Sequence, residues 1–357
     1  MTGSLGDYLQ FSGGEVVPAL KTGGSCPVYG ANGVIGYTSE SNARGPLIVV
    51  GRVGSCCGSV HYCHGDAWVS DNAFVCRARR PEETRYWYYL LKSLGLNRFR
   101  AGSGQPVLNQ RVLRSVPVHA ANLADRRRIG DMLASLDDKI VANARVIATA
   151  EVLMTTLVEQ VSESTTLANL AQRSTASINP RSLSGNVALY SFPAFDHGRR
   201  PMKLDAKMIE SVKFSITHPC VLFAKLNPRI PRIWNVSCVG SETGLASSEF
   251  VVLRPDGVDT SVLWSALRQP DVTTTITRLA RGMTGSRQRI QPRELLGIKV
   301  RDVRCLDHES SLTIATLGAV CEQGRAESAE LAAMRDRLLP QLMSGDSRLP
   351  GAPVAGE

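Results

Sequence analysis

Residues Ala121 to Val161 read ANLADRRRIGDMLASLDDKIVANARVIATAEVLMTTLVEQV. The apolar residues of this stretch recur in alternating steps of three and four, with Asn143 in the one polar slot, which is the heptad pattern of a helix that packs along a seam. These seam residues are Leu133, Leu136, Ile140, Ile147, Ala150, Met154, Leu157 and Val161. A helix of about 35 residues is roughly 50 Å long, so we expect it to need a partner helix.

A second, weaker heptad lies between Asp307 and Met343. Its seam residues are Leu317, Cys321, Gly324, Ser328, Leu331, Met334, Leu338 and Leu342. Small residues stand here where the first helix carries Asn143 and Ile147, and small residues that face large ones allow two helices to approach closely. Pro340 and Gly345 are expected to end this helix. We therefore expect the two heptad segments to pair with each other, in a parallel or antiparallel sense.

The composition is that of a soluble globular protein long enough for two or three domains. The 357 residues include 43% hydrophobic and 20% charged residues, which are ordinary values for such proteins. No apolar run approaches the length of a membrane span, and the N-terminus lacks a signal-peptide pattern. These features predict a cytoplasmic protein.

The net charge of +9 is distributed unevenly along the chain. Residues 1–120 carry +5 and residues 164–302 carry +9, whereas the helical segments 121–163 and 303–357 carry −2 and −3. A basic excess confined to two globular segments favours two surfaces that contact a polyanion. The alternative is an ordinary solvated surface in an arginine-rich protein.

The nine cysteines indicate neither a zinc ribbon nor a disulfide framework, because there is no CxxC pair and the number is odd. One cluster has enough soft ligands for zinc but a spacing that matches no common site. It consists of Cys56, Cys57, His61, Cys63 and His64. We expect structural or incidental roles for these cysteines.

The two basic segments have the same internal order. Residues 1–120, here called module 1, show short strands with glycine turns and then a helical pattern at 82–94. Residues 164–302, module 2, repeat that order with little identity. Four pairs of segments correspond: Ser4–Leu9 with Thr166–Ala171, Leu47–Arg52 with Val221–Leu226, Gly102–Val107 with Gly285–Ile290, and Val116–Val118 with Ile298–Val300. The chain thus reads as a repeat of a mixed module followed by a long helix.

Common catalytic motifs are absent from the sequence. It has no GxxxxGK[ST] phosphate loop and no GxGxxG between a strand and a helix. Motifs of the Asn-Pro-Pro-Tyr kind, which occur in enzymes that methylate exocyclic base nitrogens, are also missing. The two Asn-Pro pairs of the chain, Asn179-Pro180 and Asn227-Pro228, are each followed by Arg. Nothing in the sequence therefore indicates binding of ATP or S-adenosylmethionine by this chain.

Several short motifs occur in a fixed order within this repeat. They are Leu5–Asp7, Gly51–Gly54, Trp68–Ala73, Gly102–Leu108 with Val116–Val118, Arg126–Ile129 with Leu136–Ile140, and a closing helix from Leu331 to Gly345. In this order the chain resembles the specificity subunit of type I restriction-modification systems over nearly its full length. Each motif is weak alone, and the order within a two-fold repeat makes the resemblance specific. Module 2 departs further from the pattern, since Lys225–Pro228 replaces the Gly-Arg-x-Gly loop.

The resemblance implies an α+β fold, with two mixed α/β target recognition domains separated by two long helices that pair as an antiparallel coiled coil. The implied divisions are recognition domain 1 (1–120), a central spacer helix (121–163), recognition domain 2 (164–302), a C-terminal spacer helix (303–345) and a disordered tail (346–357).

The implied function is that of a non-catalytic DNA-reading subunit, in which each module reads one half of a bipartite site. Base edges and phosphates are contacted by side chains such as Arg, Lys, Asn and Gln, and the glycine loops are expected to present them on exposed turns. The candidates are Lys21, Tyr29, Asn32, Arg52, Gln105, Asn109, Arg111, Lys225, Arg229, Ser286, Arg287, Gln288 and Arg289.

The implied partners are double-stranded DNA, methyltransferase subunits (two are expected) and restriction or translocase subunits, with no membrane. No metal or cofactor is expected on this chain, whereas S-adenosylmethionine, ATP and Mg are expected on the partner subunits. Two alternatives remain open from the sequence. One is a fragment of a related fused methyltransferase or nuclease, and the other is a coiled-coil assembly protein that reads no sequence.

Overall fold

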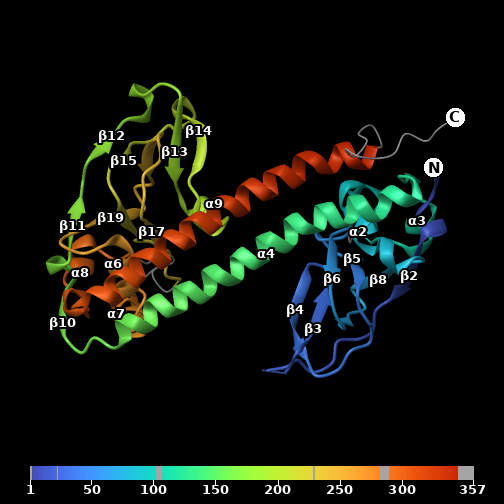
Figure 1. The fold of residues 1–357 in the computed structure, drawn as a ribbon, viewed down its shortest axis with the longest axis horizontal. Helices are drawn as coiled ribbons and strands as arrows, with labels where there is room; N and C mark the ends of the chain where they lie inside the picture. Colours follow the sequence, from blue (N-terminus) through green and yellow to red (C-terminus); the bar gives the residue numbers. More distant parts are fainter. Residues whose placement is uncertain (1, 22, 102–106, 228–229, 282–288, 345–357) are drawn as a thin grey trace. The chain divides into compact units, whose positions relative to one another are not determined.

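The computed structural model describes residues 2–21, 23–101, 107–227, 230–281 and 289–344. It divides into two compact units: unit 1 is Met1–Lys139 with Leu331–Glu357, and unit 2 is Ile140–Glu330. The two long helices α4 (Leu123–Glu159) and α9 (His308–Ser344) contribute to both units, so the division passes through the helices (Figure 1). The expected boundaries at residues 120, 163 and 302 stay predictions, and the expected disordered tail 346–357 lies outside the described residues.

Unit 1 contains a four-stranded antiparallel sheet of order β2-β8-β5-β6 and a three-stranded sheet of order β4-β3-β7. A short pair, β1 with β9, joins the beginning of module 1 to its end. The strands are β1 Thr2–Ser4, β2 Leu9–Gly13, β3 Cys26–Gly30, β4 Gly33–Thr38, β5 Leu47–Gly51, β6 Val60–Cys63, β7 Trp68–Val69, β8 Ala73–Ala78 and β9 Pro117–His119. The helices are α1 Leu5–Tyr8, α2 Thr84–Ser93 and α3 Gln110–Ser115.

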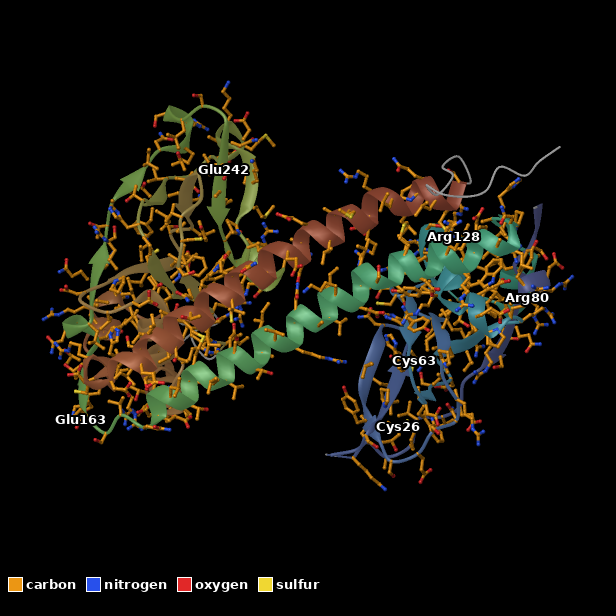
Figure 2. The ribbon with its side chains drawn as sticks, in the orientation of Figure 1. Cys26, Cys63, Arg80, Arg128, Glu163 and Glu242 are labelled. Atoms are coloured by element: carbon orange, nitrogen blue, oxygen red, sulfur yellow. The ribbon has the colours of Figure 1, made fainter. Side chains whose placement is uncertain are left out.

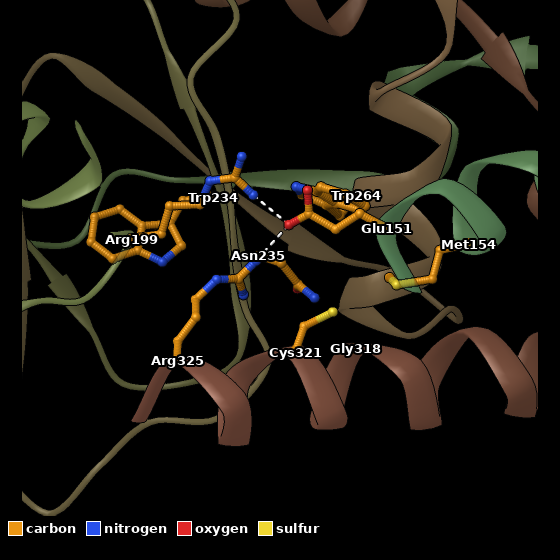
Figure 3. A pocket seen from close by; sticks show the side chains of 9 residues that line it. All are labelled: Glu151, Met154, Arg199, Trp234, Asn235, Trp264, Gly318, Cys321 and Arg325. Atoms are coloured by element: carbon orange, nitrogen blue, oxygen red, sulfur yellow. Dashed lines mark hydrogen bonds and ion pairs between the residues drawn. The ribbon is translucent and has the colours of Figure 1, made fainter. Parts of the chain in front are cut away.

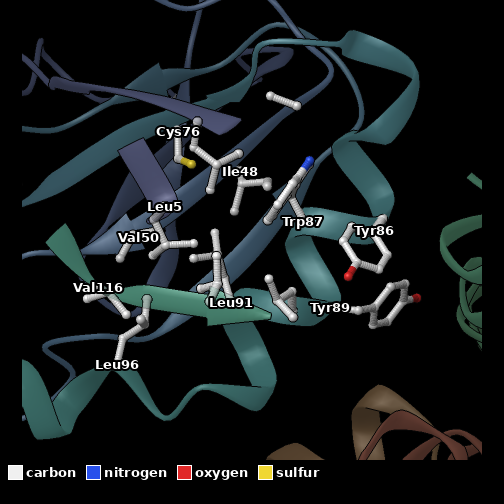
Figure 4. Close-up of a cluster of buried hydrophobic side chains, with 14 of the residues drawn as sticks. Leu5, Ile48, Val50, Cys76, Tyr86, Trp87, Tyr89, Leu91, Leu96 and Val116 are labelled. Carbon is white, nitrogen blue, oxygen red and sulfur yellow. The ribbon is translucent and has the colours of Figure 1, made fainter. Parts of the chain in front are cut away.

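The core of unit 1 is built on both faces of β5. Successive side chains of a strand point to opposite faces, so Ile48 and Val50 pack with the α2 residues Trp87 and Leu91 (Figure 4). Leu47 and Val49 belong to the cluster that joins this sheet to the three-stranded sheet. Because both faces are covered, β5 is buried along its whole length and its sequence is continuously apolar.

A buried ion pair attaches α4 to module 1 in unit 1. The Glu83 carboxylate and the Arg126 guanidinium are 3.2 Å apart, and their side chains are 3% and 5% exposed. The Trp87 indole N–H also donates to Glu83 Oε2 at 2.9 Å, while the Arg126 guanidinium lies over the rings of Tyr8 and Trp87. A buried charge is tolerated only when it is paired and hydrogen-bonded, so this contact specifies one docking position of the helix.

Unit 2 repeats the sheet arrangement of unit 1 with an enlarged second sheet. The first sheet has the order β11-β19-β16-β17, the second has the order β12-β15-β18-β13-β14, and β10 pairs with β20. The strands are β10 Ser164–Thr166, β11 Ala171–Ser174, β12 Ser177–Ile178, β13 Asn186–Tyr190, β14 Met202–Asp205, β15 Lys213–Ile216, β16 Cys220–Ala224, β17 Ile233–Val236, β18 Thr243–Ala246, β19 Phe250–Pro255 and β20 Lys299–Arg301. The helices are α5 Phe192–Asp196, α6 Thr260–Leu267, α7 Pro270–Arg281 and α8 Pro292–Leu296.

The predicted internal repeat is present, and two of the predicted correspondences are confirmed: Ser4–Leu9 with Thr166–Ala171, and Val116–Val118 with Ile298–Val300, since Ser4 pairs with Pro117 as Thr166 pairs with Lys299. The predicted alignment of Leu47–Arg52 with Val221–Leu226 is wrong by one residue. Gly51 pairs with Ala73 in unit 1, and Ala224 pairs with Phe250 at the equivalent point of unit 2. The next residues, Arg52 and Lys225, are therefore equivalent, whereas the sequence alignment matched Arg52 with Leu226. Pairing is fixed by backbone hydrogen bonds, which a comparison of side-chain types does not detect.

In each unit, the parts of α4 and α9 that belong to it pair antiparallel. In unit 2, Asn143 Nδ2 donates to Ser328 Oγ at 3.2 Å, and a Cβ added to Gly324 would lie 3.3 Å from the Ile147 side chain. In unit 1, the Asp137 carboxylate bonds the Arg335 guanidinium. As the numbering rises along α4 it falls along α9, and the expected facing of small and large residues is confirmed at Gly324.

The seam of α9 differs from the prediction at two residues. Met334 is 42% exposed, and the neighbouring Arg335 contacts α4 instead, because its ion pair with Asp137 fixes the rotation of the helix. Asp137 also accepts a 2.6 Å hydrogen bond from the Tyr89 hydroxyl of α2. Pro340 lies near the end of α9, which ends at Ser344, one residue beyond the predicted end at Met343.

In unit 2, a cluster of charged side chains links both long helices to module 2. Glu151 of α4 accepts hydrogen bonds from Arg325 of α9 and from Arg199, which follows α5 (Figure 3). Trp234, Trp264 and Met154 line the small pocket around these groups. Since all three charged side chains are largely buried, Glu151 compensates two guanidinium groups that would otherwise be buried unpaired.

Among the described residues, α4 is the helix long and apolar enough to cross a membrane by length and composition. A single helix of this kind is weak evidence for a membrane span. The same helix forms the ion pairs of Asp137 and Glu151, as expected for a helix that packs within a folded protein.

We predict that Glu151→Ala lowers the free energy of unfolding by about 2–4 kcal/mol, because it leaves two largely buried guanidinium groups without a carboxylate. Chemical denaturation followed by circular dichroism measures the change. Glu159→Ala is the matched control on the same helix, since Glu159 is exposed and its loss should cost less than about 0.5 kcal/mol. Equal stability of the two variants would contradict a structural role for the cluster.

Candidate nucleic-acid interface

In unit 1, three candidate residues lie close together where the segment after β5 contacts the segment that leads into α3. Arg52 directly follows β5, and its carbonyl accepts a 2.8 Å hydrogen bond from Leu108 N–H. The bridge between Val53 and Val107 continues this contact. We call Arg52–Val53 together with Val107–Arg111 junction 1. It holds the exposed side chains of Arg52, Asn109 and Arg111 on neighbouring segments.

The side chains of junction 1 are held by local contacts. Asn109 caps α3, because its Oδ1 accepts from Arg111 N–H at 2.8 Å. The Arg52 guanidinium donates to the Asp71 carbonyl at 3.4 Å and lies 5.6 Å from the centre of the Phe74 ring. Arg111 is exposed and forms no ion pair within the described residues. This surface therefore presents two exposed guanidinium groups and one exposed amide to a ligand.

Unit 2 has the equivalent arrangement, here called junction 2: Lys225–Leu226 with Arg289–Arg293. The Lys225 carbonyl accepts from Ile290 N–H at 3.1 Å, and Leu226 bridges Arg289. The Arg289 guanidinium donates to Glu249 Oε1 at 2.7 Å. The surface is therefore basic but already contains one carboxylate.

Burial lowers the pKa of the Lys225 ammonium, and the positive charges of Arg289 and Arg173 lower it further, while Glu249 acts in the opposite direction. When a lysine lies close to other cations and its charge is not fully neutralised by a carboxylate, a bound anion stabilises its charged form most. This environment fits a surface that contacts phosphate.

The expectation that Tyr29 lies on an exposed turn is wrong. Tyr29 is 9% exposed and belongs to the core cluster between the two sheets of unit 1, and burial raises the pKa of its hydroxyl. Tyr190 is its equivalent in unit 2, because the carbonyls of both tyrosines accept 2.9 Å hydrogen bonds from the N–H groups of Ser70 and Ser247. A tyrosine buried at the same point of both units is a packing residue.

Lys21 and Asn32 are exposed, as expected, but they lie on other segments of module 1 than junction 1. Lys21 donates to Ser39 Oγ at 3.1 Å, and Asn32 occupies the turn between β3 and β4. Five other candidates lie outside the described residues: Gln105, Arg229, Ser286, Arg287 and Gln288.

One basic residue of junction 2, Arg293, was not among the candidates predicted from the sequence. Gln291 precedes α8 as Asn109 precedes α3, so Arg293 is the equivalent of Arg111. Both segments follow one pattern, an apolar residue, an amide, any residue, Arg, any residue and Leu: Leu108–Leu113 and Ile290–Leu295. This pattern was present in the sequence, but the one-residue error in alignment concealed it.

The cysteine cluster of unit 1 lies on β6 and on the segments beside it. Cys63 ends β6 (Figure 2), while Cys57, in the turn before β6, donates to the Arg52 carbonyl at 3.2 Å. Burial raises the pKa of the thiols of Cys57 and Cys63. In the part of the chain that the structure describes, no three His, Cys, Asp or Glu side chains are grouped so as to hold a metal ion.

Residues 1–151 match the family described as the type I restriction modification DNA specificity domain. The specificity subunit of the Escherichia coli type I restriction enzyme EcoprrI is 25% identical over 111 residues. A putative type I specificity subunit from Haemophilus influenzae is 23% identical over 124 residues. These alignments cover 31% and 34% of this chain, and 28% and 32% of the two relatives.

The fold of the whole chain is also found in a solved structure. The crystal structure of the S subunit of a type I restriction-modification system from M. genitalium superposes with a TM-score of 0.67 and 15% identity, covering 96% of each chain. At this identity the similarity concerns the fold alone. It confirms the expected α+β class with two mixed modules and two long helices.

If junction 2 contacts DNA, binding should weaken at alkaline pH through Lys225. The pKa of this lysine lies below its ordinary value, so as the pH rises it loses its charge before an exposed lysine does, and its attraction to phosphate disappears. Fluorescence anisotropy with duplex DNA between pH 7 and pH 10 tests this. In Lys225→Arg the charge persists, and the fall in affinity should shift to higher pH. Identical pH profiles of the two proteins would exclude Lys225 from the interface.

Proposed function

We propose that this chain is the non-catalytic sequence-reading subunit of a type I restriction-modification system, because its residues 1–151 match the DNA specificity domain of such systems. Module 1 reads one half of a bipartite DNA site and module 2 reads the other. Methylation of adenine and restriction are then carried out by partner subunits at the site that this chain selects.

The observation that carries the proposal is the repeated junction. Junctions 1 and 2 present basic and amide side chains at equivalent points of two modules whose sequences otherwise differ. Guanidinium and ammonium groups neutralise phosphates, and Arg, Asn and Gln side chains pair with base edges. One fold present twice, with different residues around the same points, suits the reading of two different half-sites.

The exposed face of α4 within unit 2 supports docking of a methyltransferase subunit. Four apolar side chains on this helix are 44–64% exposed: Val141, Val146, Val152 and Leu153. A contiguous apolar face is costly in water and typically marks a protein interface. The surrounding positions carry little charge, with Arg145 as the exposed cation among them. We propose that two methyltransferase subunits bind, with restriction or translocase subunits added to that complex.

The cofactors of the reaction belong to the partners in this proposal. S-adenosylmethionine would be bound by the methyltransferase subunits, and ATP and Mg by the restriction subunits, because this sequence contains no motif for either. The complex would act on chromosomal and invading DNA in the cytoplasm.

The two modules should act as independent readers. Exchange of residues 1–120 for the equivalent module of a related protein is expected to change one half of the methylated motif and to leave the other half intact. Sequencing of methylated DNA from a host that carries the hybrid measures this. If both halves of the motif changed together, the modules would not be separate readers.

The docking face of α4 should be separable from DNA binding. Val152→Asp introduces a charge where an apolar contact is proposed, and it should weaken association with the methyltransferase subunit by at least about tenfold, since a buried valine contributes about 1.5–3 kcal/mol. Binding of the isolated chain to DNA should not change. Val16→Asp is the matched control, because Val16 is 77% exposed on another segment. Unchanged assembly of the Val152 variant would place the interface elsewhere.

A further inference from the structure

Two basic positions are shared by both modules at equivalent points of the backbone. Arg52 and Lys225 each follow the central strand of the first sheet, and their carbonyls accept from Leu108 N–H and Ile290 N–H. Arg111 and Arg293 each occupy the second residue of the short helix that follows. The charge at both positions is the same in the two modules.

Other positions in the two junctions, or directly beside them, differ between the modules. Val107 of junction 1 corresponds to Arg289 of junction 2, since they form equivalent bridges with Val53 and Leu226. Asn72 corresponds to Glu249, because their carbonyls accept 2.9 Å hydrogen bonds from the N–H groups of Arg52 and Lys225. An apolar residue is thus replaced by a cation, and an amide by a carboxylate.

A structural explanation does not account for the shared arginines. Arg111 and Arg293 are exposed and form no ion pair within the described residues. The contacts that hold the junctions are made by the backbone and by the buried side chains of Leu113 and Leu295. The charge of these arginines is therefore directed to solvent or to a ligand.

Resting on the proposed function, we propose a division of labour within each junction. The shared cations Arg52 with Arg111, and Lys225 with Arg293, contact the phosphate backbone, which is the same in every half-site. The divergent positions, Asn72 with Val107 and Glu249 with Arg289, determine which bases are accepted. Phosphate contacts fix the position of a protein on the duplex without selecting sequence, whereas contacts with base edges select it.

The chemistry of the divergent positions agrees with this assignment. Carboxylates accept from the cytosine amino group, arginine pairs with guanine, and asparagine pairs with adenine. In junction 2, Glu249 and Arg289 are joined by their 2.7 Å contact, and Glu249 Oε2 is buried with no hydrogen-bond partner within the described residues. This pair can exchange its internal contact for contacts with a base pair, which the neutral pair in junction 1 cannot do.

The test uses the full chain with two duplexes, one carrying the methylated motif mapped in the host and one with that motif scrambled. Arg111→Ala and Arg293→Ala should each weaken binding to both duplexes by the same factor, about fivefold at 150 mM salt, and lower the slope of log K against log[salt] by about 0.9. The double variant should lower the slope by about 1.8. The methylated motif should not change. Arg278→Ala, an exposed arginine of α7, is the matched control and should leave both affinities intact.

The divergent positions should respond in the opposite way. Arg289→Ala should relax one position of one half-site in methylation mapping, with the other half-site preserved. Loss of selectivity in Arg111→Ala or Arg293→Ala, or an unchanged salt slope in both, would overturn the division of labour. Failure of the proposed function would look different, since wild-type protein would then bind the two duplexes equally.

Discussion

The antiparallel pairing of α4 with α9 is the interaction on which the other features of the structure depend. Each helix has 37 residues, and the stability of such a helix comes chiefly from burial of its apolar stripe. The stripe is covered by the other helix and by the modules, with Gly324 allowing close approach at Ile147. Asn143 reaches three polar atoms of α9 at one level, and a buried amide of this kind specifies the register of a helix pair.

The attachment of the modules to these helices relies on charge as well as on apolar contact. In unit 1, Glu83 forms an ion pair with Arg126, whose guanidinium lies over the rings of Trp87 and Tyr8. In unit 2, Glu151 forms ion pairs with both Arg199 and Arg325. Buried ion pairs contribute little net stability, but breaking one is costly. In both units, a buried charge must keep its partner within bonding distance, and this requirement fixes one position of the module on the helices. The residues that form the ion pairs differ between the two units.

The long helices were predictable because heptad spacing is a local pattern that survives divergence, as the burial of Leu133, Met154 and Cys321 demonstrates. The failures concern tertiary information. Tyr29 follows a glycine-rich pattern typical of turns but is buried because a second sheet covers it. Arg293 was missed because alignment by motif placed Ile290 opposite Val107, one residue out of register, although the ends of the modules were aligned correctly. Met334 was assigned to the seam from its spacing alone. The spacing does not reveal the ion pair between Arg335 and Asp137, which turns Arg335 rather than Met334 toward α4.

The way the junctions are held explains how the two modules can diverge at the surface while keeping one fold. Backbone groups make the supporting hydrogen bonds, from Leu108 to Arg52 and from Ile290 to Lys225. Equivalent bonds from Leu5 N–H to the Val116 carbonyl, and from Leu167 N–H to the Ile298 carbonyl, close each module near its helix. Because these bonds do not depend on side-chain identity, substitutions such as valine for arginine at the Val107 and Arg289 positions change the chemistry of the surface without removing its support. In the proposed function, a surface built in this way can change the sequence that it reads while the helix pair and the docking of the modules are retained.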